Sequence, residues 1–180
     1  MRNVFLFTGL HPKRYYNEAR DSIMEYNPDA TCLWIPGKGM SFTRAMNVGT
    51  EMIVQLAEPD WIFYMDDDVI CTGEIDTRHL QTNAIYGNTI KEKWNIQYLE
   101  GWIMAVPLLL AVTIKFDEGI KASGFEDFDY CMQAKGAGYT IQRYDFLFDH
   151  LRAGEKRQIT KNYGDVRRKN IEYVERKWKL

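Results

Sequence analysis

Along the first third of the chain, short apolar runs alternate with longer stretches in which apolar residues recur at helical spacing. The short runs have the length of buried strands, and the longer stretches have the period of amphipathic helices. Turn signals, Thr8-Gly9 and Pro36-Gly37, close the first two runs. We therefore expect a strand, helix, strand, helix, strand order over residues 4–7, 15–26, 31–35, 41–56 and 61–65.

The second predicted helix begins at Ser41, whose hydroxyl can cap it. Strands separated by helices in this way are parallel and joined by right-handed crossovers. In such sheets ligands bind beyond the carboxyl ends of the strands, so Thr8-Gly9 and the residues after the third strand should share one rim. The buried stripe of the helix is expected to run through Ala45, Val48, Met52 and Leu56.

The rest of the pattern is less regular. Strands are expected over residues 95–99, 103–114, 139–143 and 146–148, and helices over 127–135 and from Asp165 onward. The last helix carries Ile171, Val174 and Trp178 on one face, which we expect to pack on the domain. The sequence therefore predicts one α/β domain over residues 1–180, with a mixed, mostly parallel central sheet flanked by helices.

Composition supports a folded domain and narrows the kinds of partner. Of the 180 residues, 46% are hydrophobic and 14% aromatic, enough to fill a core. The formal net charge of -2 argues against nucleic-acid binding. Basic residues gather in the C-terminal segment and helix, residues 152–180, which could touch an anionic membrane, although packing on the domain is the expectation.

Cysteine content and the start of the chain indicate the compartment. Three cysteines without metal-finger spacing favour a reducing environment, although a single disulfide stays open. We find no signal peptide, and the longest apolar run, residues 102–114, is too short to span a membrane. We therefore expect a cytoplasmic protein.

Three consecutive carboxylates, Asp66, Asp67 and Asp68, follow the third predicted strand directly. Like charges this close repel, and burying them is costly unless something neutralises them. A divalent cation such as Mg²⁺ or Mn²⁺, shared with substrate phosphates, is the usual partner of such oxygen clusters. A solvated acidic loop is the alternative. Alternation along an extended segment would turn Asp66 and Asp68 toward a ligand and Asp67 away.

Other polar groups occur in an order that fits a metal site. An acidic cluster opens a predicted helix, where the helix dipole alone would favour carboxylates. His150 follows a strand, and a lone histidine is usually structural. The groups are Arg44, Asn47 and Gly49 before the acidic strand, and Gly101-Trp102, Glu126, Asp127, Asp129 and His150 after it.

In this order and spacing the chain resembles the inverting glycosyltransferases of the GT-A fold, particularly the large family two of nucleotide-sugar enzymes. The resemblance spans roughly residues 4–152. It implies transfer of a sugar from a UDP- or GDP-sugar to the hydroxyl of a glycan or protein acceptor that the sequence does not identify. It also implies a Mn²⁺ or Mg²⁺ cofactor, held by Asp66, Asp68 and His150, with Asp149 orienting the imidazole.

The resemblance assigns the remaining roles as well. Asp127 is implied as the general base, and Asp129 supports the helix start. A free aspartate has a pKa of about 3.9, so proton transfer to Asp127 must be late and concerted. Acceptor binding is implied for Glu126, Gly101 and Trp102. Nucleotide-sugar binding is implied for Thr8, Gly9, Arg44, Asn47, Asp66, Asp67, Lys156 and Arg157.

Two points leave alternatives open. The family usually ends its second strand with an acidic residue that reads the base, whereas here that strand ends Ile35-Pro36-Gly37-Lys38. The donor nucleotide is therefore undefined. A sugar-phosphate nucleotidyltransferase would use a similar sheet, although Thr8-Gly9 begins a poor version of its glycine-rich loop. A non-catalytic GT-A-like binding module is the third possibility.

Overall fold

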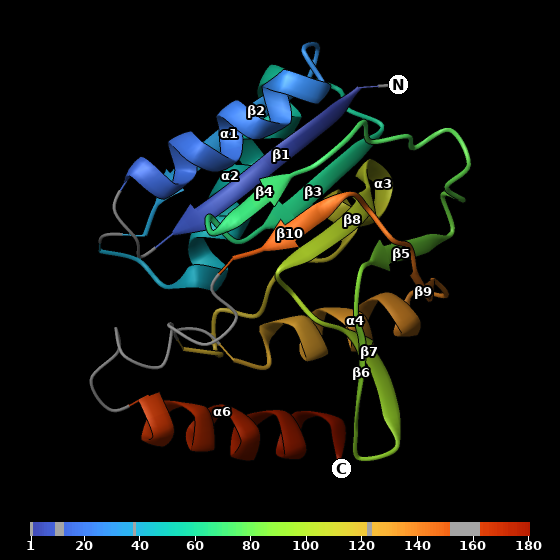
Figure 1. Ribbon diagram of the computed structural model, residues 1–180. Coiled ribbons are helices and arrows are strands. Elements are labelled where there is room, and N and C mark those ends of the chain that lie inside the picture. The colour runs from blue at the N-terminus through green and yellow to red at the C-terminus, as the bar shows by residue number, and fades with distance from the viewer. Residues whose placement is uncertain (1, 10–12, 38, 122–123, 152–162) are drawn as a thin grey trace.

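The structure is a computed structural model that describes residues 2–9, 13–37, 39–121, 124–151 and 163–180 (Figure 1). The strands are β1 (Asn3–Gly9), β2 (Thr31–Pro36), β3 (Trp61–Met65), β4 (Val69–Cys71), β5 (Ala84–Gly87), β6 (Ile90–Lys93), β7 (Ile96–Leu99), β8 (Ile103–Pro107), β9 (Thr140–Arg143) and β10 (Phe148–His150). The helices are α1 (Lys13–Tyr26), α2 (Phe42–Leu56), α3 (Leu108–Thr113), α4 (Glu126–Gly136) and α6 (Tyr163–Trp178).

A six-stranded sheet in the order β2-β1-β3-β8-β5-β9 forms the centre of the domain. β1 runs parallel to both β2 and β3, and β5 runs parallel to β9, whereas β8 is antiparallel to β3 and β5. The predicted mixed, mostly parallel sheet is therefore confirmed. Two small antiparallel pairs, β4 with β10 and β6 with β7, lie outside it.

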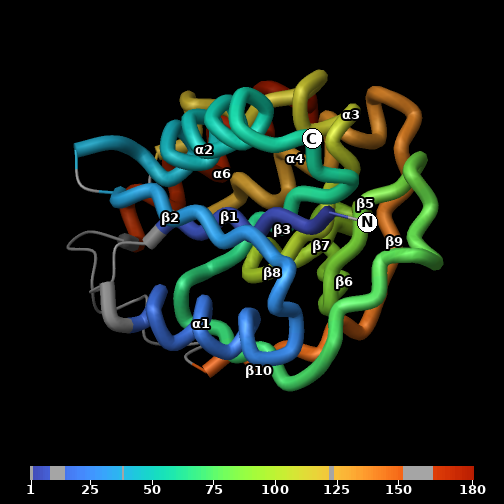
Figure 2. The backbone as a smooth tube through the Cα atoms, turned by 90° about the horizontal axis from the view of Figure 1, so that it is seen from above, coloured from blue at the N-terminus to red at the C-terminus, as the bar shows by residue number. Residues whose placement is uncertain are grey.

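Helices cover both faces of this sheet, which is why its central strand is hydrophobic throughout. Figure 2 shows α1 and α2 on opposite sides of β1. All five residues of β3 are buried, as expected for a strand enclosed on both faces. Alternate residues of β1 point to different cores: Phe5 and Phe7 belong to one buried cluster, Val4 and Leu6 to the other.

Helix α2 begins where the sequence predicts, but it presents a different face to the sheet. Ser41 caps it by accepting a hydrogen bond from the Arg44 amide. Of the predicted stripe, Ala45 is buried, whereas Leu56 is 77% exposed. The prediction was wrong because α2 packs closely: a Cβ at Gly49 would lie 2.4 Å from Leu6 Cδ1. The buried face therefore combines small and polar side chains with only two large apolar ones, Met46 and Ile53; its members are Thr43, Ala45, Met46, Asn47, Gly49, Thr50 and Ile53.

The strand predicted over residues 103–114 is also only half right. β8 ends at Pro107, and Leu108–Thr113 form helix α3. Proline cannot donate to a sheet ladder but fits the start of a helix, so the strand stops there. The leucines and alanine that follow are good helix formers.

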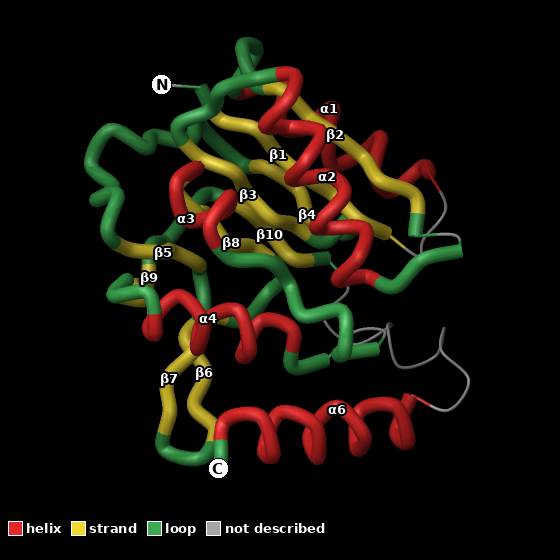
Figure 3. Tube along the Cα trace, turned by 180° about the vertical axis from the view of Figure 1, so that it is seen from behind, coloured by secondary structure: helices red, strands yellow, loops and turns green. Residues whose placement is uncertain are grey.

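The terminal helix α6 packs on the domain as predicted. Val174 is fully buried in a third cluster with Ile120, Phe125 and Phe128, and Ile171 and Trp178 pack against it. Figure 3 shows α6 beside α4, with the β6–β7 hairpin at one end of the two helices. Within the described part of the chain, no helix is long and apolar enough to cross a membrane.

Candidate metal centre and active site

The acidic triplet lies at the carboxyl end of β3, the rim at which the parallel strands β1 and β2 also end. Asp66, Asp67 and Asp68 are all buried, with exposed fractions of 7%, 2% and 3%. Asp66 is held through its backbone, because its amide donates to the Trp102 carbonyl at 3.1 Å. The triplet is thus part of the folded rim and not a solvated loop.

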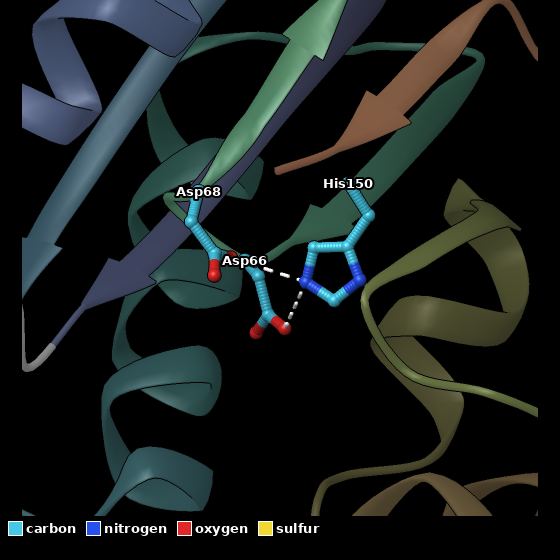
Figure 4. Close-up of side chains that lie close together, drawn as sticks. All are labelled: Asp66, Asp68 and His150. Atoms are coloured by element: carbon cyan, nitrogen blue, oxygen red, sulfur yellow. Dashed lines mark ion pairs between the residues drawn. The ribbon is translucent and has the colours of Figure 1, made fainter. Parts of the chain in front are cut away.

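A short antiparallel pairing brings His150 to these aspartates. Strand β10 pairs with β4 so that His150 lies opposite Val69, the residue after Asp68. The Leu151 amide then donates to the Asp68 carbonyl at 3.0 Å. As Figure 4 shows, His150 Nε2 points between the two carboxylates, 3.3 Å from Asp68 Oδ1 and 3.9 Å from Asp66 Oδ2.

The imidazole of His150 is fixed by stacking. The Trp102 indole lies parallel to it, with ring centroids 5.0 Å apart and an interplanar angle of 10°. Asp149, expected to orient this histidine, is exposed. Strand alternation turns adjacent side chains of β10 to opposite faces, and no contact between Asp149 and His150 is observed, so the orienting role of Asp149 stays a prediction.

Asp66, Asp68 and His150 each offer one ligand atom, and these three atoms lie within 4.8 Å of one another. Two carboxylate oxygens and one imidazole nitrogen form a donor set that suits Mn²⁺ or Mg²⁺. Among the described residues, this is the group that could hold a metal ion. Asp67 is not a member, in agreement with the predicted alternation.

Asp127, in the first turn of α4, contacts the Gly101-Trp102 turn. Its Oδ2 accepts a hydrogen bond from the Gly101 amide at 3.1 Å, and its Oδ1 accepts one from the Phe128 amide at 2.7 Å. Burial raises the pKa of Asp127 to about 6, against the lowering effect of these two amides, and the charge of Glu100 raises it further. A carboxyl poised near neutral pH can accept a proton more readily than an ordinary aspartate.

The dipeptide Gly101-Trp102 joins the two parts of the site. The Gly101 amide donates a hydrogen bond to Asp127. The Trp102 ring stacks on His150, and the Trp102 carbonyl accepts a hydrogen bond from the Asp66 amide. The structure therefore brings together the predicted metal ligands and the predicted base, which are far apart in the sequence. Acceptor binding by Gly101 and Trp102 stays a prediction, because their observed contacts position other site residues.

Glu126 begins helix α4 beside Asp127, at a strained turn. Phe125 precedes it with a φ of 73°, a left-handed conformation that non-glycine residues rarely adopt. The Glu126 carboxylate accepts a hydrogen bond from the Gly124 amide. Residues held in such conformations often occur at functional sites, and the acceptor role of Glu126 stays a prediction.

Thr8 and Gly9 end β1 on the same rim, where a nucleotide was expected. The Thr8 hydroxyl is buried and, within the described residues, has no hydrogen-bond partner. Gly9 lies opposite Pro36 in the parallel pairing with β2. The nucleotide contacts expected of Thr8 and Gly9 therefore stay predictions.

Arg44 and Asn47 are directed to a different segment. The Asn47 amide donates to the Phe116 carbonyl at 2.9 Å and accepts from the Phe116 amide at 2.9 Å. Arg44 Nη1 lies 3.5 Å from a Glu118 carboxylate oxygen. These contacts fasten α2 to residues 116–118 and do not join the aspartate–histidine group. Lys156 and Arg157, the predicted diphosphate contacts, lie outside the described residues.

Sequence reasoning underestimated Asp129. Only 1% exposed, it accepts hydrogen bonds from Trp178 Nε1 at 2.8 Å and Gln133 Nε2 at 2.9 Å, and Lys177 Nζ lies 2.8 Å away. Asp129 thus ties α4, the helix that carries Asp127, to α6. A buried carboxylate needs such partners, and the acidic cluster alone gave no signal of which member would be buried.

No protein-family model matches the sequence, and no curated protein matches it. Solved structures do. GalNAc-T7 with UDP, GalNAc and Mn²⁺ gives a TM-score of 0.63 at 8% identity, over 82% of this chain and 43% of that one. The mannosyltransferase PcManGT from Pyrobaculum calidifontis with GDP-Man and Mn²⁺ gives a TM-score of 0.57 at 12% identity, over 79% of this chain and 54% of that one.

A glycosyltransferase involved in glycosylation of the major capsid of PBCV-1 is similar over nearly its whole length. The TM-score is 0.56 at 12% identity, over 87% of this chain and 98% of that one. By contrast, this chain spans 43% of GalNAc-T7 and 54% of PcManGT. At such low identities the likeness establishes the fold, and the chain has the GT-A glycosyltransferase fold that the sequence predicted.

Proposed function

We propose that this protein is a metal-dependent inverting glycosyltransferase, which moves a sugar from a nucleotide-diphosphate donor to an acceptor hydroxyl. One observation carries the proposal: the Gly101-Trp102 turn links the Asp66–Asp68–His150 group to Asp127 at the carboxyl rim of a GT-A sheet. The two solved structures named above with Mn²⁺ contain UDP or GDP-Man, which supports a nucleotide-sugar donor.

The metal part of the proposal rests on the donor set. Asp66, Asp68 and His150 would hold Mn²⁺ or Mg²⁺, and the stacked Trp102 ring restrains the orientation of the imidazole. When bound, the ion supplies positive charge that offsets the charge growing on the diphosphate leaving group. Thr8, Gly9 and Asp66 lie on the rim where the nucleotide would bind, and Arg44, Asn47, Asp67, Lys156 and Arg157 remain further candidate contacts.

Asp127 would remove the proton of the acceptor hydroxyl as its oxygen attacks the anomeric carbon. Its pKa of about 6 leaves it ionised at neutral pH and yet more basic than a free aspartate. The amides of Gly101 and Phe128 fix both carboxylate oxygens, so the basic lone pairs keep one direction. Attack on the face opposite the leaving group inverts the anomeric centre.

The test is transfer itself. Purified protein is incubated with UDP- or GDP-sugars, Mn²⁺ and a panel of glycoside acceptors, and the released nucleoside diphosphate is quantified. Proton NMR of the product then gives the anomeric configuration. We expect turnover with inversion, lost in Asp127→Asn. Release of pyrophosphate from a nucleoside triphosphate and a sugar phosphate would instead identify a nucleotidyltransferase, and no turnover of any donor would favour a binding module.

A further inference from the structure

Two cations approach one aromatic ring beside the candidate base. Lys93 Nζ lies 5.6 Å and the Arg167 guanidinium 5.2 Å from the centroid of the Phe125 ring. Lys93 also lies 4.7 Å from the Trp94 ring. The two cations come from distant parts of the chain, the β6–β7 hairpin and α6, and meet where α4 begins. We call Lys93, Arg167 and Phe125, with Trp94, the cationic patch.

Neighbouring cations differ from these two in having acidic partners. Lys91 Nζ lies 3.7 Å from a Glu100 oxygen, and Arg168 lies 3.0 Å from Glu172. By contrast, no carboxylate among the described residues lies within ion-pair distance of Lys93 or Arg167. An aromatic ring attracts a cation but carries no net charge, so both positive charges of the patch remain available to an anion.

The patch adjoins the catalytic end of α4. Phe125 immediately precedes Glu126 and Asp127, and its ring lies 5.8 Å from Trp94. The pKa of Tyr98 responds to both the candidate base and a patch cation. Burial, Asp127 and Glu100 raise this pKa to about 12, whereas Arg167 lowers it. One phenol therefore lies within electrostatic reach of the candidate base and of a patch cation. Phe125 and Tyr98 therefore connect the patch to the turn that carries Asp127.

The acids around the patch already have donors of their own. The Asp127 carboxylate accepts hydrogen bonds from the Gly101 and Phe128 amides, and the Glu126 carboxylate accepts one from the Gly124 amide. Glu100 forms an ion pair with Lys91. These carboxylates keep their negative charge, but among the described residues none of them forms an ion pair with Lys93 or Arg167. A purely structural role for the two cations, covering Phe125 with their aliphatic stems, is the competing explanation.

We propose that the cationic patch binds a negatively charged group, a phosphate or a carboxylate, of the acceptor. Arginine and lysine together suit such a group, because the planar guanidinium pairs with two oxygens and the ammonium adds a compact charge. This inference rests on the proposed function, since it assumes that Asp127 faces an acceptor. It assigns the substrate class as an anionic glycan or glycoside.

The test compares three probes that share one sugar ring and differ at carbon 6. Methyl glucoside, methyl glucuronide and methyl glucoside 6-phosphate are titrated into ¹⁵N-labelled protein, and the Trp94 indole signal is followed; the galacto series is run in parallel. We expect at least one anionic probe to bind tenfold or more tightly than its neutral counterpart. The carboxylate and phosphate arms identify which anion is preferred.

Variants of matched cations locate the effect. Lys93→Met and Arg167→Met, made singly, should each abolish most of the preference for anionic over neutral probes. The control variants Lys91→Met and Arg168→Met, at cations that have acidic partners, should keep this preference. Methionine retains an apolar stem over the aromatic rings, and circular dichroism checks folding. Equal affinity for neutral and anionic probes would overturn the proposal, as would an unchanged preference in both patch variants. Binding of anionic vesicles that depends on the patch, without preference among the sugars, would also overturn it.

The two proposals can fail separately. Mn²⁺-dependent binding and slow hydrolysis of a nucleotide sugar need no acceptor, so they report on the glycosyltransferase alone. If the protein hydrolyses a donor but shows no preference for anionic probes, only the further inference is wrong. If it binds no donor under any condition, the proposed function is wrong whatever the patch binds.

Discussion

Replacing Gly101 with alanine tests whether this glycine positions the candidate base. The added Cβ would lie 2.9 Å from the Asp127 Cβ and 3.5 Å from its Cγ and Oδ2. Carbon atoms in ordinary contact are about 3.5–4.0 Å apart, so something must move by roughly 0.6–1 Å. The Cβ of Asp127 is attached to the first turn of α4 and cannot rotate away, so the relief has to come from the backbone.

The expected effect falls mainly on the chemical step. A misplacement of about 1 Å can cost roughly 100-fold in rate, and overpacking of this kind costs about 1–3 kcal/mol of stability. The alanine amide can still donate to Asp127, so the loss would reflect displacement and not a missing donor. We expect kcat to fall about 100-fold, with the affinity for Mn²⁺ and donor retained. Initial rates at saturating substrates and urea unfolding measure the two effects.

Gly136→Ala is the matched control, because Gly136 ends the same helix and an added Cβ there meets nothing within 4 Å. This substitution should leave kcat unchanged and either leave stability unchanged or raise it by up to about 1 kcal/mol. If Gly101→Ala keeps kcat within threefold of the wild type, the reasoning that Gly101 positions Asp127 is refuted.

Three further predictions concern the ionisation of Asp127 and two buried contacts that hold helices α6 and α2 on the domain. The wild-type rate should rise as the pH increases through about 6, because Asp127 then ionises, and a rate that stays flat down to pH 5 would contradict this. The free energy of unfolding should fall as the pH rises from about 4 to 6, because the native state holds the proton of Asp127 more tightly than the unfolded chain does. Trp178→Phe removes the indole donor to buried Asp129 and should lower the free energy of unfolding in urea by about 1–3 kcal/mol. A loss below about 0.5 kcal/mol would contradict this prediction. Asn47→Ala breaks two hydrogen bonds to the Phe116 backbone and should cost about 2–4 kcal/mol in urea unfolding, and a loss below about 0.5 kcal/mol would contradict this. The donor KM of the same variant tests the candidate nucleotide contact of Asn47, which a large rise would support.

The sequence predicted the rim of the sheet well because the relevant signals are local. Apolar runs marked β1, β2 and β3, and the residues that follow a parallel strand must lie at its carboxyl end. The division of the triplet, with Asp66 and Asp68 in the metal-capable group, agrees with strand alternation and with the ligands that the family resemblance implied.

Packing contacts between distant segments could not be predicted in this way. The pairing of β4 with β10 and the hydrogen bond from Gly101 to Asp127 join residues separated by dozens of positions. The buried face of α2 was mistaken because hydrophobicity ranks Leu56 above Gly49, whereas close approach to Leu6 requires the glycine. The role of Asp129 in holding α6 likewise depends on tertiary contacts.

The central claim is that Asp66, Asp68 and His150 form a metal site that serves a nucleotide-sugar donor. Isothermal titration of UDP- and GDP-sugars, with and without Mn²⁺, measures this most directly, with His150→Ala and Asp68→Asn as site variants and His79→Ala as a control at an exposed histidine. We predict binding of at least one donor that requires Mn²⁺ and is weakened at least tenfold in both site variants but not in the control. Donor binding that is unaffected by Mn²⁺ or by these variants, or no binding at all, would contradict the claim.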